Sequence, residues 1–107
     1  MTSEFKLAPS ILSADFADLK SALTQCESGG AHWIHIDVMD NQFVPNLTIG
    51  PPVVKSLRSK TNKFFDVHMM VIDPENLVEP FAKAGADMIS FHVEATNDIQ
   101  SVIDLIK

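Results

Sequence analysis

The sequence predicts an α/β fold in which short parallel strands alternate with helices. Apolar runs of strand length recur four times along the 107 residues, and a longer segment with helical character follows each run. Gly and Pro residues, which favour turns and helix ends, stand at the junctions. Right-handed crossovers then place consecutive strands side by side, with the helices packed on one face of the sheet.

Composition and charge narrow the classes of protein to be considered. Lys and Arg total 8 against 14 Asp and Glu, and the net charge of −6 argues against nucleic-acid and membrane partners. The single cysteine, Cys26, cannot form an internal disulfide, which fits a reducing compartment. Residues 1–6 lack the apolar core of a signal peptide, and no apolar run approaches the ~20 residues of a membrane span. The expected location is therefore cytoplasmic.

The first two units are predicted from their apolar runs and helix-end residues. The first strand is expected at 5–10 and its helix at 15–28, with Ser13 as the N-cap and Gly29-Gly30 as the stop. The second strand is expected at 33–39. A loop over 40–49 then leads to Gly50 and two prolines, which suit the start of a helix that continues to Ser59.

The third and fourth units follow the same pattern. A strand is expected at 63–70, and Asp73-Pro74-Glu75 predicts an N-cap, a first-turn proline and a first-turn acid for a helix that ends at Ala84. Gly85 separates that helix from the fourth strand, at 87–92. Asn97 or Asp98 is expected to begin the last helix, which reaches Lys107.

Alternation within the strands predicts two different faces, because successive side chains point to opposite sides. Ile34, Ile36 and Val38 share one face of the second strand, whereas His35, Asp37 and Met39 share the other; the later strands repeat this division. A solvated outer face is the alternative, but such faces favour Lys, Glu and Thr over the His, Asp, Ser and Met seen here. Ligands of parallel α/β folds bind at the carboxyl ends of the strands, so we expect a functional site there.

Three side chains on this face suggest a metal site. His35 and Asp37 stand two residues apart on one strand, and His68 lies at a comparable depth on the next. Two imidazoles and a carboxylate suit a divalent metal, and the alternative is a hydrogen-bonded His-Asp pair in a core. Three residues are considered for a fourth ligand: Ser10, Asp66 and His92. A carboxylate beside a metal also suits proton abstraction next to a carbonyl, whereas Met39 and Met70 suit either a pocket lining or core packing.

Four segments, in chain order, resemble the ribulose-phosphate 3-epimerase family. They are LAPSILSADF at 7–16; HIDVMD, FVPN and IGP within 35–51; DVHMMV and PE within 66–75; and FHVEA at 91–95. The resemblance covers nearly the whole chain. One departure is Asn41, where the family usually has glycine after Val-Met-Asp. Asn tolerates the left-handed conformation better than most residues, so we expect the turn to form.

This resemblance implies an isomerase that inverts C3 of ribulose 5-phosphate to give xylulose 5-phosphate through a cis-enediolate. It implies that His35, Asp37 and His68 bind one divalent metal ion (Zn, Fe, Mn or Co) and that Asp37 also acts as an acid/base carboxylate. A second carboxylate on the opposite face of the sugar completes the family's proton exchange. Four residues are implied to contact the sugar phosphate: Ser10, Met39, His68 and Met70.

The family's fold is a TIM barrel, a (β/α)8 barrel of ~250 residues. Residues 1–107 are therefore expected to form the N-terminal half of an epimerase barrel, with about four of the eight βα units. The second carboxylate, which is also the fourth metal ligand, and the phosphate loops are expected in the other half. A half barrel exposes unpaired strand edges, so a non-catalytic fragment or self-associating module is the alternative. The expected partners are a sugar phosphate and either a second copy or a complementary half barrel.

Overall fold

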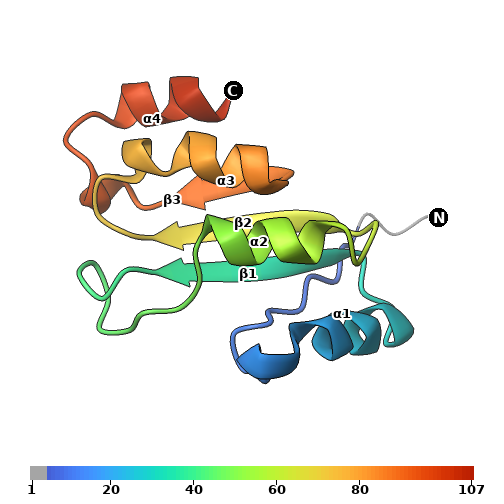
Figure 1. Ribbon diagram of the computed structural model, residues 1–107. Coiled ribbons are helices and arrows are strands. Elements are labelled where there is room, and N and C mark those ends of the chain that lie inside the picture. Colours follow the sequence, from blue (N-terminus) through green and yellow to red (C-terminus); the bar gives the residue numbers. More distant parts are fainter. Residues whose placement is uncertain (1–4) are drawn as a thin grey trace.

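The computed structural model describes residues 5–107, which contain a three-stranded parallel sheet in the order β1-β2-β3 (Figure 1). The strands are β1 (Trp33–Met39), β2 (Phe64–Met70) and β3 (Met88–Phe91). The helices are α1 (Leu19–Ser28), α2 (Pro51–Arg58), α3 (Val78–Ala84) and α4 (Ile99–Ile106). Three short 3-10 turns are η1 (Phe16–Asp18), η2 (Pro74–Asn76) and η3 (Val93–Ala95). The predicted parallel α/β alternation is confirmed, and the architecture is that of a partial TIM barrel.

Residues 1–4, part of the segment predicted to lack a signal-peptide core, lie outside the described residues. Within 5–107, no helix combines the length and the apolar character that crossing a bilayer needs. The three strands point the same way in Figure 1, and the loop after β1 extends beyond their carboxyl ends.

The predicted first strand, at 5–10, is not a regular strand. Ser10 forms a single parallel bridge to His35, although Leu7 and Pro9 also accept hydrogen bonds from the backbone of β1. Trp33 donates to Leu7 over 3.1 Å and His35 donates to Pro9 over 2.9 Å. Pro9 has no backbone N–H, so it cannot donate to a ladder, and the pairing stays irregular. The segment nevertheless lies along the free edge of β1 and brings Ser10 beside it.

The two faces of the sheet differ as the alternation predicts. Side chains toward the helices are buried, and each such burial stabilises the fold by roughly 1.5–3 kcal/mol. They include Ile34, Ile36, Val38, Phe65, Val67 and Met69. On the opposite face of β1, His35, Asp37 and Met39 are only half-buried. Helix α2 packs across β1 and β2 on the apolar side, which leaves the polar face open (Figure 1).

The start of the first helix corrects the prediction that Ser13 is its N-cap. Residues of η1 form a 3-10 turn before α1, so the regular helix begins further along the chain. Asp15 caps the turn by accepting from the Ala17 N–H over 2.9 Å. Asp18 caps α1 by accepting from the Ser21 N–H over 3.4 Å. Carboxylates at these positions satisfy amide groups that have no partner within the helix.

Asp73 holds the predicted N-cap position followed by a first-turn proline, but it precedes the 3-10 turn η2 and does not cap the regular helix α3. Asp73 adopts a left-handed conformation with φ of 48°, and its side chain makes no capping hydrogen bond. Pro74 instead begins the 3-10 turn η2, and α3 follows after Leu77. At the last helix the prediction is confirmed, because Asp98 caps α4 by accepting from the Ser101 N–H over 3.1 Å.

Arg58, the last residue of α2, connects this helix to the segment before β3 and to β2, at the amino-terminal end of the strands. Its guanidinium donates to the Gly85 carbonyl over 3.1 Å and to Asp87 over 2.8 Å, and lies 3.8 Å from the centroid of the Phe65 ring. Gly85 has φ of 122°, which favours glycine, and approaches Arg58 so closely that an added Cβ would collide with its side chain. This end of the sheet lies opposite the carboxyl ends of the strands and serves stability.

Candidate metal-binding active site

The polar face of the sheet brings together the three residues predicted as metal ligands. His35 and Asp37 project from the same face of β1, because they are two residues apart. Asp37 pairs in register with His68 of β2, so the second imidazole lies directly beside the carboxylate. One potential donor atom from each residue lies within 4.8 Å of the others.

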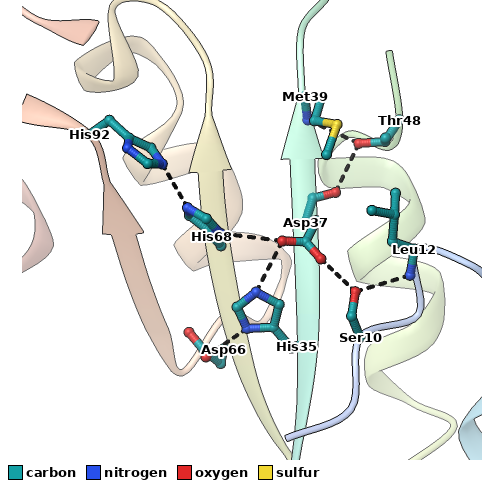
Figure 2. A network of polar contacts seen from close by, with 9 residues as sticks. All are labelled: Ser10, Leu12, His35, Asp37, Met39, Thr48, Asp66, His68 and His92. Atoms are coloured by element: carbon teal, nitrogen blue, oxygen red, sulfur yellow. Dashed lines mark hydrogen bonds and ion pairs between the residues drawn. The ribbon is translucent and has the colours of Figure 1, made fainter. Parts of the chain in front are cut away.

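The side chains converge on one carboxylate oxygen. Asp37 Oδ1 lies 3.0 Å from His35 Nε2 and 3.2 Å from His68 Nδ1, and Figure 2 shows both rings turned toward it. The side chain of Asp37 is 12% exposed, against 25% for His35 and 28% for His68. The cluster is therefore sheltered by the sheet but still accessible from its open face.

Imidazole nitrogens and a carboxylate oxygen are ligands for divalent transition metals. The three residues fit such an ion, because their donor atoms are already close and face one another across the strand pair.

Asp66, one candidate for a fourth ligand, lies behind His35 instead. Asp66 Oδ2 contacts His35 Nδ1 over 2.9 Å, on the side of the ring away from Asp37. Desolvation lowers the pKa of His35, but the Asp66 hydrogen bond and the negative charges of Asp37 and Asp66 outweigh it, so the pKa is raised above its usual value. Asp66 thus orients His35, one of the predicted ligands, and does not join the group of convergent donor atoms.

Ser10, the second candidate, contacts the other oxygen of Asp37. Its hydroxyl donates to Asp37 Oδ2 over 2.5 Å and accepts from the Leu12 N–H over 3.1 Å. The irregular segment before α1 therefore orients the carboxylate from the edge of β1 (Figure 2). The predicted contact of Ser10 with the substrate stays a prediction.

His92, the third candidate, follows β3 and contacts the far side of His68. The two Nε2 atoms lie 2.8 Å apart, whereas His68 Nδ1 faces Asp37. Each of the three candidates for a fourth ligand therefore contacts one of the predicted ligands. The group of convergent donor atoms consists of His35, Asp37 and His68 without them.

Met39 and Met70 end their strands side by side. They are partners in the β1–β2 register, both are half-buried, and Met39 lies on the same face as Asp37. This position is compatible with lining a pocket over the cluster, and the role stays a prediction. A groove among the helices, lined by Pro51, Lys55, Glu79 and Leu105, shares no residue with the cluster.

Thr48 closes the loop after β1 and was not predicted from the sequence. Its hydroxyl donates to the Asp37 carbonyl over 2.8 Å and accepts from the Met39 N–H over 2.9 Å. These bonds hold the end of β1, and with it the Asp37 backbone, against residues 41–49. A contact between residues 11 apart, with an irregular loop between them, has no periodic signal in the sequence.

Asp40 is a second residue that the sequence did not single out. One carboxylate oxygen accepts from the N–H groups of Gln42 and Phe43, and the other accepts from Ile72 after β2, each over 2.9 Å. Burial raises the pKa of Asp40, but these backbone hydrogen bonds outweigh it and hold the pKa below its usual value. Asn41 has φ of 60°, as expected for the residue in the glycine position. Asp40 therefore joins the loops that follow β1 and β2.

Parallel βα units with convergent polar side chains at the carboxyl ends of the strands define the class of the barrel enzymes. A sequence model described as the Ribulose-phosphate 3 epimerase family matches residues 6–107, and the chain belongs to that family.

Three relatives named ribulose-phosphate 3-epimerase are similar to this chain. The Treponema pallidum protein is 53% identical over 107 residues, which are 100% of this chain and 49% of the relative. The Synechocystis protein is 55% identical over 94 residues, 88% of this chain and 41% of the relative. The Bacillus subtilis protein is 53% identical over 102 residues, 95% and 47% respectively. The chain thus spans about half the length of the curated relatives that it matches.

Proposed function

We propose that residues 1–107 form the N-terminal half of a (β/α)8 barrel and supply half of the active site of a ribulose-phosphate 3-epimerase. The observation that carries this proposal is the convergence of His35, Asp37 and His68 on the open face of the sheet. The family membership and the half-length match to relatives of that name support the reaction. The substrate pair is ribulose 5-phosphate and xylulose 5-phosphate.

One divalent metal ion (Zn, Fe, Mn or Co) would be held by His35 Nε2, Asp37 Oδ1 and His68 Nδ1. When bound, the ion supplies Lewis-acid polarisation of the ketose carbonyl and thereby acidifies the neighbouring C3–H. His35 is held for this task by Asp66, which accepts from the ring nitrogen that faces away from the ion.

Asp37 is the proposed catalytic residue and moves the proton at C3. Its Oδ1 faces the two histidines, so Oδ2 remains to take the proton as a general base. The Ser10 hydroxyl, 2.5 Å from Oδ2, orients this oxygen. Inversion then requires a proton donor on the opposite face of the sugar, which we assign to a second carboxylate outside residues 1–107.

Four residues are proposed to contact the sugar phosphate: Ser10, Met39, His68 and Met70. The two methionines would cover the apolar edge of the sugar, because they end adjacent strands above the cluster. We further propose a cytoplasmic location, in line with the name of a rice relative that is a cytoplasmic isoform and 50% identical over 103 residues.

Proton exchange at C3 tests the proposal without requiring a complete barrel. The 107-residue chain, loaded with a divalent metal, is incubated with ribulose 5-phosphate in D2O, and NMR follows both C3 deuteration and xylulose 5-phosphate. A single carboxylate predicts deuterium incorporation without inversion, because the proton leaves and returns on one face. Asp37→Asn, purified identically, controls for contaminating epimerase from the host. Deuteration no faster than in this variant would contradict the catalytic role of Asp37.

A second candidate function is a self-associating module that is not catalytic by itself. Among residues 5–107, β3 pairs with β2 alone, so its outer edge presents unpaired backbone groups. Either a second copy or a complementary half barrel could pair with this edge. Met88, 38% exposed, begins the edge strand in register with Asp66, so Met88→Lys should weaken association. Sedimentation showing a well-folded monomer at high concentration would contradict self-association.

A further inference from the structure

Two imidazole rings lie in direct polar contact beside the proposed metal site. His68 Nε2 and His92 Nε2 are 2.8 Å apart, and the ring centroids are 5.0 Å apart. A hydrogen bond between two ring nitrogens requires one to carry the proton and the other to offer its lone pair. The direction of this bond therefore depends on which nitrogen of His68 is protonated.

The other contact of His68 decides that question when a metal is bound. His68 Nδ1 faces Asp37 Oδ1 over 3.2 Å and belongs to the cluster of donor atoms. A ring that offers the Nδ1 lone pair to a metal and stays neutral carries its proton on Nε2. The His68 Nε2–H then donates, and His92 Nε2 accepts.

We propose that His92 is a positioning residue that holds His68 in the metal-binding tautomer and orientation. This inference rests on the proposed function, because it takes His68 Nδ1 as a metal ligand. Histidine ligands of metals generally donate their other ring N–H to an outer acceptor, which raises metal affinity. Asp66 accepts from the outer nitrogen of His35, and His92 does the same for His68.

The two outer acceptors differ in chemistry. Asp66 offers a carboxylate oxygen to His35, and His92 offers an imidazole nitrogen to His68.

Packing against another ring fixes His92 itself. The Phe43 ring lies 5.2 Å from the His92 ring, centroid to centroid, on a loop whose backbone Asp40 holds. The His92 carbonyl accepts from the Ala95 N–H over 2.9 Å in the turn that follows β3. The orientation of His68 therefore depends on segments after both β1 and β3.

Three variants of the full 107-residue chain test this role. His92→Phe keeps a ring of similar size and removes the acceptor. His92→Gln restores an acceptor oxygen near the position of Nε2, whereas Asn is one methylene shorter and does not reach it. Co2+ is titrated into each variant against a competing chelator, with the visible spectrum of the bound ion as a second readout. Thermal unfolding of the metal-free variants reports whether each one is folded.

His92→Phe is expected to weaken Co2+ binding by about 10–100-fold and to change the Co2+ spectrum. His92→Gln should recover most of the lost affinity, and His92→Asn should not. If His92→Phe fails to fold, the difference in Co2+ affinity between His92→Gln and His92→Asn still tests the role, because both variants carry an amide and differ only in its reach. Equal Co2+ affinity and equal spectra in the wild type and the folded variants would overturn the role of His92. Failure of the wild type to bind Co2+ is a different result, because it would overturn the proposed metal site and with it this role.

Discussion

The Ser10 hydroxyl donates to Asp37 Oδ2 over 2.5 Å, while Asp37 Oδ1 faces the two histidines. The two oxygens of one carboxylate therefore have separate surroundings. One belongs to the proposed metal set and the other to the proposed proton transfer. A serine on an irregular segment at the edge of the sheet maintains this division, because its own oxygen is held by the Leu12 N–H.

Ser10→Ala should reduce proton transfer more than it reduces metal binding. Loss of the hydroxyl leaves Asp37 Oδ2 free to rotate, but it does not alter the atoms facing His35 and His68. We expect C3 deuteration to slow by about 10-fold, since misorientation of a catalytic base is costly, with Co2+ affinity nearly unchanged. Ser13→Ala, at an exposed serine three residues away, is the matched control. A large loss of Co2+ affinity in Ser10→Ala would contradict the separation of the two oxygens.

Asp66→Asn should weaken metal binding without removing a metal ligand. The amide is a poorer acceptor for the His35 N–H, so we expect Co2+ affinity to fall by about 10–100-fold. Asp87→Asn controls for general destabilisation, because Asp87 contacts Arg58 and the Phe65 N–H at the other end of the strands. We expect Asp87→Asn to lower stability and to leave Co2+ affinity intact. Equal losses of affinity in the two variants would assign Asp66 a structural role only.

Asp40→Asn should destabilise the fold in a pH-dependent way. The folded-state pKa of Asp40 is lowered, so its ionised form contributes stability above the unfolded pKa of ~3.9, and this contribution is lost as the pH falls through the folded value. Replacing the carboxylate that accepts three backbone N–H groups should cost about 1–2 kcal/mol at pH 7. Urea unfolding at pH 7 and at acid pH measures the difference between variant and wild type.

The difference for Asp40→Asn should shrink at acid pH, where the wild-type carboxyl is also protonated. Asp104→Asn, at an exposed carboxylate on α4, should show little effect at either pH. A constant difference across the pH range would mean that the charge of Asp40 does not stabilise the two loops.

Gly85→Ala should destabilise the chain more than Gly30→Ala. Both glycines have positive φ, 122° and 92°, so an alanine costs about 1 kcal/mol at each through the backbone alone. An added Cβ at Gly30 meets nothing within 4 Å, whereas at Gly85 it would lie 2.6 Å from Arg58 Cγ. We expect a further ~1–3 kcal/mol from this overlap. Chemical unfolding of both variants measures it, and equal losses would mean that Arg58 moves aside freely.

Much of the fold was predictable because the apolar alternation is local. The buried positions of β1 and the position of Asp98 at the start of α4 follow from side-chain period and cap chemistry. The strand expected at 5–10 was not formed, because Pro9 cannot donate to a ladder. Ser13 and Asp73 were plausible caps by type, but 3-10 turns shifted the start of both helices. Helix boundaries depend on such turns, which leave little periodic signal.

The candidate site was likewise predictable in part. Spacing along one strand places His35 and Asp37 together, and the parallel register brings His68 beside them. The ring nitrogen that each histidine turns toward Asp37 depends on side-chain rotamers and on tertiary neighbours, so it was not predictable from spacing. The contacts of Asp40 and Thr48 cross irregular loops, where no pattern links the partners.

A crystal of the 107-residue chain grown with Co2+ shows whether His35, Asp37 and His68 bind a metal, through an anomalous-difference map measured at the cobalt edge. We expect one strong peak at about 2.0–2.2 Å from His35 Nε2, His68 Nδ1 and an oxygen of Asp37. Asp66 and His92 should remain hydrogen-bonded to the outer ring nitrogens. No peak between β1 and β2, or a peak bound by Asp66 or His92 in place of these atoms, would contradict the proposed metal site.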